Sequence, residues 1–125
     1  MNRRRVGEEQ EEHACRYLVE RGVLIRERNF RCRQGEIDII GYEKGYLVFF
    51  EVKYRKDGSR GSAAEAVGPG KQRKICRVSD YYRALHGYSL DTPVRFDVIA
   101  IDGSRIEWIQ NAFPYRERQA GRGSL

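Results

Sequence analysis

The sequence predicts an α+β domain in which helices flank a mixed β-sheet. Three observations support this class: residues 6–21 and 69–86 have helical apolar spacing, β-type runs lie between and after them, and glycine or polar turn residues separate the segments. In order, the segments are a helix, three strands, a helix, and one or two strands. At 125 residues, we expect one domain over residues 1–115, followed by a flexible tail over residues 116–125.

The first predicted helix covers residues 6–21. Four acids crowd its start and match the helix dipole: Glu8, Glu9, Glu11 and Glu12. Ala14 and Leu18 form the inward stripe, and Gly22 ends the helix. Glu11 precedes Ala14 by one helical turn, so it points inward. From the residues alone, a surface acid that stabilises the helix dipole is the preferred interpretation of Glu11.

A first strand follows over residues 23–31, and then two β-type runs separated by the polar link 42–45. We expect a hairpin with a four-residue loop, in which Gly41 faces Tyr46. In this register Asp38 and Glu51 are diagonal neighbours, about 7–8 Å apart between backbones. One divalent cation bridges that gap easily.

The hairpin is predicted to place charged and apolar side chains on one face. By alternation, that face carries Glu36, Asp38, Ile40, Leu47, Phe49, Glu51 and Lys53. The other face is a core face with Ile37, Ile39, Val48, Phe50 and Val52. Acids among large apolar side chains are costly unless something pairs them, and a metal ion would do so. The alternative is an amphipathic hairpin whose charged face meets water.

Such a carboxylate group supports a specific chemistry. Carboxylates prefer hard cations such as Mg²⁺, which keep waters and substrate phosphate in their shell. The cation lowers the pKa of bound water and neutralises charge at phosphorus. Lys53, two residues from Glu51 on the same strand face, can orient the attacking water or stabilise developing charge.

The remaining segments complete the predicted sheet. Residues 56–62 read as a mobile loop that either closes over a phosphate backbone or simply connects, and residues 63–67 as a short helical turn. The second helix, 69–86, has the inner stripe Ile75, Val78, Tyr82 and Leu85. Gln72 lies near its buried side.

Two strands are expected at the end of the domain. Residues 94–102 form a strong strand, and Asp102-Gly103 turns it into a short last strand over residues 105–108. Asp97 is expected to be an ion-pair or edge residue and not a metal ligand.

The charge distribution favours a polyanionic partner. The net charge is +6 with a pI near 9.4. Residues 53–77 alone carry eight basic residues against Asp57 and Glu65, a balance equal to the net charge of the whole chain. The eight are Lys53, Arg55, Lys56, Arg60, Lys71, Arg73, Lys74 and Arg77. We therefore expect nucleic acid to bind here, with a solvated basic face as the alternative.

Other features of the sequence bear on the compartment. The three cysteines are widely spaced and contain no CxxC pair, so we expect reduced thiols. No run approaches 18 apolar residues, and the start is no signal peptide. We expect a cytoplasmic protein without membrane contact.

Several motifs carry a resemblance to a known family. They are Arg28-Asn29-Phe30-Arg31, Gly35-Glu36-Ile37-Asp38, Glu51-Val52-Lys53-Tyr54-Arg55, Ala63-Ala64-Glu65-Ala66-Val67, Lys71-Gln72 and Arg95-Phe96-Asp97-Val98. Over nearly the whole chain this combination resembles the YraN-like family of small bacterial proteins, which looks like a branch of the PD-(D/E)XK nuclease superfamily, related in fold to Holliday-junction resolvases. The resemblance implies a restriction-endonuclease-like αβββαβ core. Ile37 stands where the superfamily name has proline, a position without chemistry.

The resemblance also implies roles for two further residues. Glu11 occupies the position of the family's first-helix glutamate, although Gln10 replaces a glycine of that motif. Gln72 belongs to the family's Lys-Gln pair and could hydrogen-bond a site carboxylate or a phosphate. A plain helix glutamine is the alternative for Gln72.

The leading hypothesis is a metal-dependent endonuclease acting on DNA, branched or single-stranded. Glu11, Asp38 and Glu51 would hold Mg²⁺ or Mn²⁺, with Lys53 at the water and Gln72 in support. The alternatives are a nucleic-acid-binding protein that kept the fold without catalysis, and a scaffold whose basic face meets an acidic protein. A homodimer is an open possibility.

Overall fold

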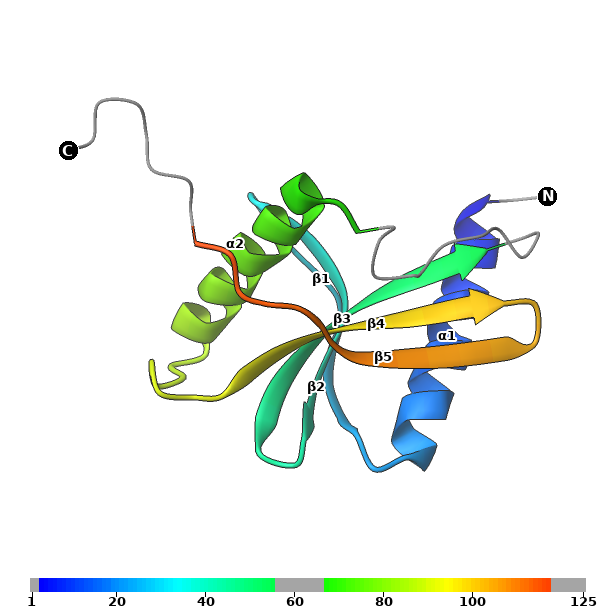
Figure 1. The fold of residues 1–125 in the computed structure, drawn as a ribbon, viewed down its shortest axis with the longest axis horizontal. Helices are drawn as coiled ribbons and strands as arrows, with labels where there is room; N and C mark the ends of the chain where they lie inside the picture. Colours follow the sequence, from blue (N-terminus) through cyan, green and yellow to red (C-terminus); the bar gives the residue numbers. More distant parts are fainter. Residues whose placement is uncertain (1–2, 56–66, 118–125) are drawn as a thin grey trace.

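The computed structural model describes residues 3–55 and 67–117, and over these ranges it has two helices and five strands (Figure 1). They are α1 (Arg3–Glu20), β1 (Leu24–Cys32), β2 (Gly35–Glu43), β3 (Tyr46–Arg55), α2 (Pro69–Leu85), β4 (Val94–Asp102) and β5 (Arg105–Phe113). They form one sheet in the order β1-β2-β3-β4-β5, in which β3 and β4 are parallel and the other neighbours antiparallel. The predicted α+β class, a mixed sheet flanked by helices, is confirmed.

Each helix covers one face of the sheet. The cluster under α1 contains Ala14, Leu18, Val23, Ile39, Val48, Phe50, Ile99 and Ile101. The cluster under α2 contains Ile37, Ile40, Leu47, Phe49, Ile75, Val78, Tyr82, Phe96, Val98 and Phe113. The middle strands are therefore buried on both faces, which explains their nearly continuous apolar runs.

The turn between β2 and β3 corrects the predicted hairpin register. Lys44 and Gly45 both have positive φ, 51° and 86°, and form a two-residue loop. Gly41 therefore faces Val48, so the predicted four-residue loop and the pairing of Gly41 with Tyr46 are wrong. A turn with two left-handed residues matches the strand twist and lets the ladder continue to the end of β2. As a result Ile39 faces Phe50, and Asp38 and Glu51 are the next residues on their strands.

A second correction concerns the two faces of β2. Ile37 packs with the cluster under α2, whereas Ile39 packs with the cluster under α1, so the prediction that they share a core face is wrong. Alternation breaks at Asp38, where β2 leaves the ladder with β3. Here the Asp38 side chain replaces a backbone carbonyl as hydrogen-bond acceptor, because the Val52 N–H donates to Asp38 Oδ2 at 2.8 Å. A site acid therefore lies where the two strands diverge.

The apolar stripe of α2 is confirmed at three of its four positions. Ile75, Val78 and Tyr82 are buried, but Leu85 is 57% exposed, so its predicted inward position is wrong. At this end of the helix Tyr82 contacts the rings of His86 and Tyr88.

The predicted ion pair of Asp97 is confirmed and is part of a buried network. Arg95 contacts Asp97 at 2.9 Å and Glu43 at 2.8 Å. Asp97 also accepts hydrogen bonds from the Trp108 side chain and the Asn111 N–H. This bond at Asn111, which has a φ of 52°, lets β5 continue to Phe113, beyond the short strand predicted over residues 105–108.

Two further observations concern the cysteines and the helices. Cys15, Cys32 and Cys76 are free thiols. No helix in the described part of the chain is long and apolar enough to cross a membrane. The loop expected over residues 56–62, and most of the helical turn expected over residues 63–67, lie outside the described residues.

Candidate active site

Asp38 and Glu51 form the centre of the candidate site, at the point where β2 and β3 diverge. Asp38 is partly buried and Glu51 is 7% exposed. Burial raises the pKa of Glu51 to about 7, and the neighbouring charge of Asp38 adds to the rise. Burial also raises the pKa of Asp38, although the Val52 N–H and a hydrogen bond from Glu51 oppose it. Both carboxyl groups are therefore harder to ionise than an exposed acid.

Glu11 reaches the same region from α1. One of its carboxylate oxygens, Oε1, is buried and has no hydrogen-bond partner among the described residues. Burial raises the pKa of Glu11, as does the charge of Asp38, while a hydrogen bond with the Asn29 side chain lowers it. The inward direction predicted from its spacing to Ala14 is confirmed, and a plain surface acid does not describe this residue.

Two lysines stand beside the carboxylates. Lys53 follows Glu51 by two residues on β3, so alternation places both on the same face. Lys71, in the first turn of α2, has its Nζ 3.6 Å from Glu51 Oε1. The sequence predicts Lys71 only as part of the nucleic-acid-binding surface. Its contact with Glu51 depends on how α2 packs on the sheet, which no local pattern reveals.

Gln72 is buried, as expected from its spacing to Ile75, but its side-chain hydrogen bonds stabilise the start of α2. Its Nε2 donates to the Val67 carbonyl at 2.7 Å, and its Oε1 accepts from Arg116 Nε. In this structure these groups, rather than a site carboxylate, are its partners. Arg116, the first residue of the expected tail, thus lies against α2, which the chain after β5 crosses in Figure 1.

The carboxylates suit a hard divalent cation in their chemistry. Within the described ranges, no three histidine, cysteine, aspartate or glutamate side chains are already gathered closely enough to hold a metal. The pKa values of the partly buried Asp38 and the buried Glu51 are nevertheless both raised, and Glu11 offers an oxygen without a hydrogen-bond partner among the described residues. Mg²⁺ and Mn²⁺ are commonly held by one or two carboxylates, while waters and substrate phosphate complete the shell. The residues present fit such an ion.

The basic residues of the sequence prediction divide into three groups. Lys71 and Lys74 are exposed and Arg73 is partly exposed, all in the first turns of α2, where Lys71 contacts Glu51. Arg77 is instead held by Asp80, Tyr115 and the Arg116 carbonyl. Arg55 ends β3, and Lys56 and Arg60 lie outside the described residues.

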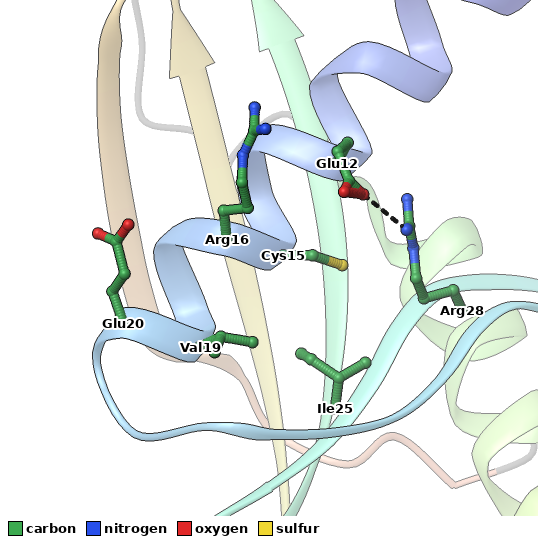
Figure 2. Close-up of a pocket in the computed structure, with 7 residues that line it drawn as sticks. All are labelled: Glu12, Cys15, Arg16, Val19, Glu20, Ile25 and Arg28. Atoms are coloured by element: carbon green, nitrogen blue, oxygen red, sulfur yellow. Dashed lines mark hydrogen bonds and ion pairs between the residues drawn. The ribbon is translucent and has the colours of Figure 1, made fainter.

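A separate pocket of about 420 Å³ lies between α1 and β1 (Figure 2). Figure 2 shows Cys15, Val19 and Ile25 facing its interior, while the ion pair of Glu12 and Arg28 closes one side at 2.8 Å. None of the site carboxylates is among its lining residues. The candidate chemistry therefore lies at the strand divergence and not in this pocket.

Comparison with known proteins gives one consistent match. The sequence model of the Uncharacterised protein family UPF0102 matches residues 10–101, a range that includes Glu11, Asp38, Glu51 and Gln72. A UPF0102 protein from Lachnoclostridium phytofermentans is 45% identical over 90% of this chain and 96% of its own length. UPF0102 proteins from Ralstonia nicotianae and Vibrio vulnificus are 46% and 43% identical, covering 86% and 89% of this chain and 85% and 93% of their own lengths.

Proposed function

The chain belongs to the uncharacterised protein family UPF0102, as the YraN-like resemblance predicted, and we propose that it is a metal-dependent endonuclease that hydrolyses phosphodiester bonds in DNA. One observation carries the proposal. Asp38 and Glu51, whose pKa values are both raised, lie where two strands diverge, with Lys71 beside Glu51 and Lys53 two residues after Glu51 on β3. Perturbed acids of this kind, next to cations, are typical of functional sites.

In the proposed mechanism Asp38 and Glu51 would hold Mg²⁺ or Mn²⁺, and the Glu11 oxygen without a hydrogen-bond partner among the described residues would complete the acidic group. The ion, when bound, supplies Lewis-acid polarisation of the phosphate and lowers the pKa of water. The chain itself supplies position and charge. Lys53 orients the attacking water and stabilises negative charge that develops at the phosphate. Burial of Glu51 limits competing water and strengthens these electrostatic effects.

The proposed substrate, DNA in a branched or single-stranded form, follows from the charges around the acids. Lys71, Arg73 and Lys74 lie in the first turns of the helix that contacts Glu51. A phosphate backbone lying over these residues would bring a scissile bond to the carboxylates. The chain has a net charge of +6, so association with a polyanion is favoured at low salt.

A second candidate function is nucleic-acid binding without catalysis. Glu51 already has a partner in Lys71, and Gln72 is engaged with Val67 and Arg116. Other groups of the chain thus already pair the Glu51 charge and the Gln72 hydrogen-bonding groups, as in a protein that kept the fold but lost the reaction. Both candidates predict DNA binding, so only cleavage separates them.

The deciding experiment is a cleavage assay on linear, single-stranded, flapped and four-way DNA with Mg²⁺ or Mn²⁺. We expect cleavage of at least one form, and its loss in Asp38→Asn, Glu51→Gln and Lys53→Ala, because each removes a ligand or the water-orienting charge. DNA binding should hold or tighten in the two carboxylate variants. Asp102→Asn, an exposed acid at the end of β4, is the matched control and should cut normally. If every DNA form stays uncut although calorimetry demonstrates metal binding, the endonuclease proposal fails and nucleic-acid binding without catalysis remains.

A further inference from the structure

Lys71 is the only basic side chain of α2 for which the structure records an ion pair with a site carboxylate among the described residues. Its Nζ lies 3.6 Å from Glu51 Oε1, and the two side chains differ sharply in exposure, 47% for Lys71 and 8% for Glu51. The carboxylate is therefore held inside the protein, while the ammonium group approaches it from solvent. A long, half-exposed lysine side chain has the freedom to leave such a contact.

The backbone that carries Lys71 is anchored on both sides. Val67 is 1% exposed, and its carbonyl accepts the hydrogen bond from Gln72. The Gln72 N–H donates to the Gly68 carbonyl at 3.0 Å, and Arg116 donates to the Gln72 side chain. Lys71 thus starts from a rigid turn beside the carboxylates, and only its side chain needs to move.

The electrostatics of the pair suggest what would move it. The positively charged Lys71 ammonium lies 3.6 Å from an oxygen of the Glu51 carboxyl group, the group proposed to hold the metal ion. A divalent cation on Glu51 would compete with the ammonium for the same carboxylate, because like charges at short range repel.

We propose that Lys71 is a mobile countercharge, which neutralises Glu51 while no metal is bound and turns to a phosphate of the nucleic acid when a divalent cation takes its place. This inference rests on the proposed function, since it uses the same carboxylates and the same class of ligand. It assigns to Lys71 a role different from that of Lys74, which is exposed one turn later on the same helix. Lys74 then serves as the matched control.

The first test is Mn²⁺ binding by calorimetry, without nucleic acid and at about pH 8, where Glu51 is ionised, for wild type, Lys71→Ala, Lys71→Arg and Lys74→Ala. Removing the competing charge should tighten Mn²⁺ binding in Lys71→Ala about fivefold, the scale of a partly exposed ion pair. Lys71→Arg keeps the charge, so its affinity should resemble wild type, as should that of Lys74→Ala. Equal affinities for both alanine variants, or no Mn²⁺ binding at all, would overturn the inference.

The second test is affinity for a short linear DNA duplex with and without Ca²⁺, with the DNA checked by gel to be intact. Lys71→Ala should weaken binding only when the cation is present, because only then is the lysine released to the phosphate. Lys74→Ala should weaken binding equally in both conditions. A loss in Lys71→Ala that is the same with and without Ca²⁺ would show a permanent phosphate contact and overturn the inference.

These tests separate the inference from the proposed function. If no DNA form is cut but Lys71→Ala still tightens Mn²⁺ binding and weakens DNA binding only with Ca²⁺, the endonuclease proposal fails and the countercharge stands. If wild type cuts DNA and Lys71→Ala changes Mn²⁺ affinity no more than Lys74→Ala does, the endonuclease stands and the countercharge fails.

Discussion

Glu51 shows how one buried acid links stability to function. Its folded-state pKa of about 7 is raised from the ordinary value of 4.5 by burial and by Asp38. The folded protein therefore holds a proton on Glu51 that the unfolded chain releases between about pH 4.5 and 7. A group with a raised folded pKa stabilises the protein below its unfolded pKa, and this contribution is lost as pH rises through the folded pKa.

We predict that Glu51→Gln removes this loss of stability. An amide stays neutral at every pH, so the variant should exceed the metal-free wild type in stability at pH 8 by about 1–3 kcal/mol. Near pH 4, where Glu51 is protonated in both states, the two proteins should differ little. Melting temperatures from pH 4 to 8 in a chelator measure this.

The control for that comparison is Glu107→Gln, an exposed acid on β5. Its curve should run parallel to wild type. A Glu51→Gln curve that also runs parallel would contradict the raised pKa of Glu51, whether or not the protein cuts DNA.

Close packing at the start of the sheet explains why α1, and with it Glu11, lies near the other acids. Gly41 on β2 has no room for a side chain. A Cβ there would lie 2.8 Å from Val23 Cγ1 and 3.1 Å from the Leu24 carbonyl oxygen. Val23 is buried in the link between α1 and β1. Glycine therefore lets this link approach β2.

We predict opposite effects for two glycine-to-alanine changes. Gly41→Ala should destabilise the protein by about 1–3 kcal/mol, because Val23 and the Leu24 backbone must shift. A Cβ at Gly70, in the first turn of α2, would meet nothing within 4 Å. Gly70→Ala should stabilise the protein by roughly 0.5 kcal/mol through helix propensity and a less flexible unfolded chain. Denaturant midpoints of the two variants test this, and equal midpoints would contradict the packing argument.

The positive charge of the whole molecule gathers partly beside the acids. Lys71, Arg73 and Lys74 follow one another around the start of α2, next to Glu51. Arg77, expected in the same surface, is instead engaged with Asp80 and Tyr115. We therefore expect three residues, and not four, to form the α2 part of a DNA-binding face.

We predict that Lys71→Ala, Arg73→Ala and Lys74→Ala together flatten the salt dependence of DNA binding. Each phosphate contact contributes about 0.9 to the slope of log affinity against log salt, so the slope should fall by up to about 2–3. Affinities between low and moderate salt measure the slope. The control removes the same charge from α1, the β2–β3 turn and β5, through Arg16→Ala, Lys44→Ala and Arg105→Ala. A control slope that falls as much would place the binding face elsewhere.

Some features of this protein follow from local sequence. The apolar run of residues 47–50 predicts a buried strand, and the strand over residues 94–102 has the predicted bounds. The inward direction of Glu11 follows from helical spacing to Ala14. These predictions hold because helix and strand periodicity depends on neighbouring residues alone.

Other features needed the tertiary structure. The hairpin register depends on Lys44 adopting a left-handed conformation, for which a lysine is a weak sequence signal. The change of face at Asp38 arises because β2 leaves β3, and a side-chain carboxylate replaces a backbone partner.

The sequence by itself determined the family, the α+β class and the acids and lysines from which a site could be built. Only the tertiary structure decided that the pKa values of Asp38 and Glu51 are raised, that Lys71 contacts Glu51, and that Gln72 holds the start of α2. The physical reason is that these contacts join elements far apart in the chain. Their distances depend on strand divergence and helix packing, whereas composition and periodicity report only on each element separately.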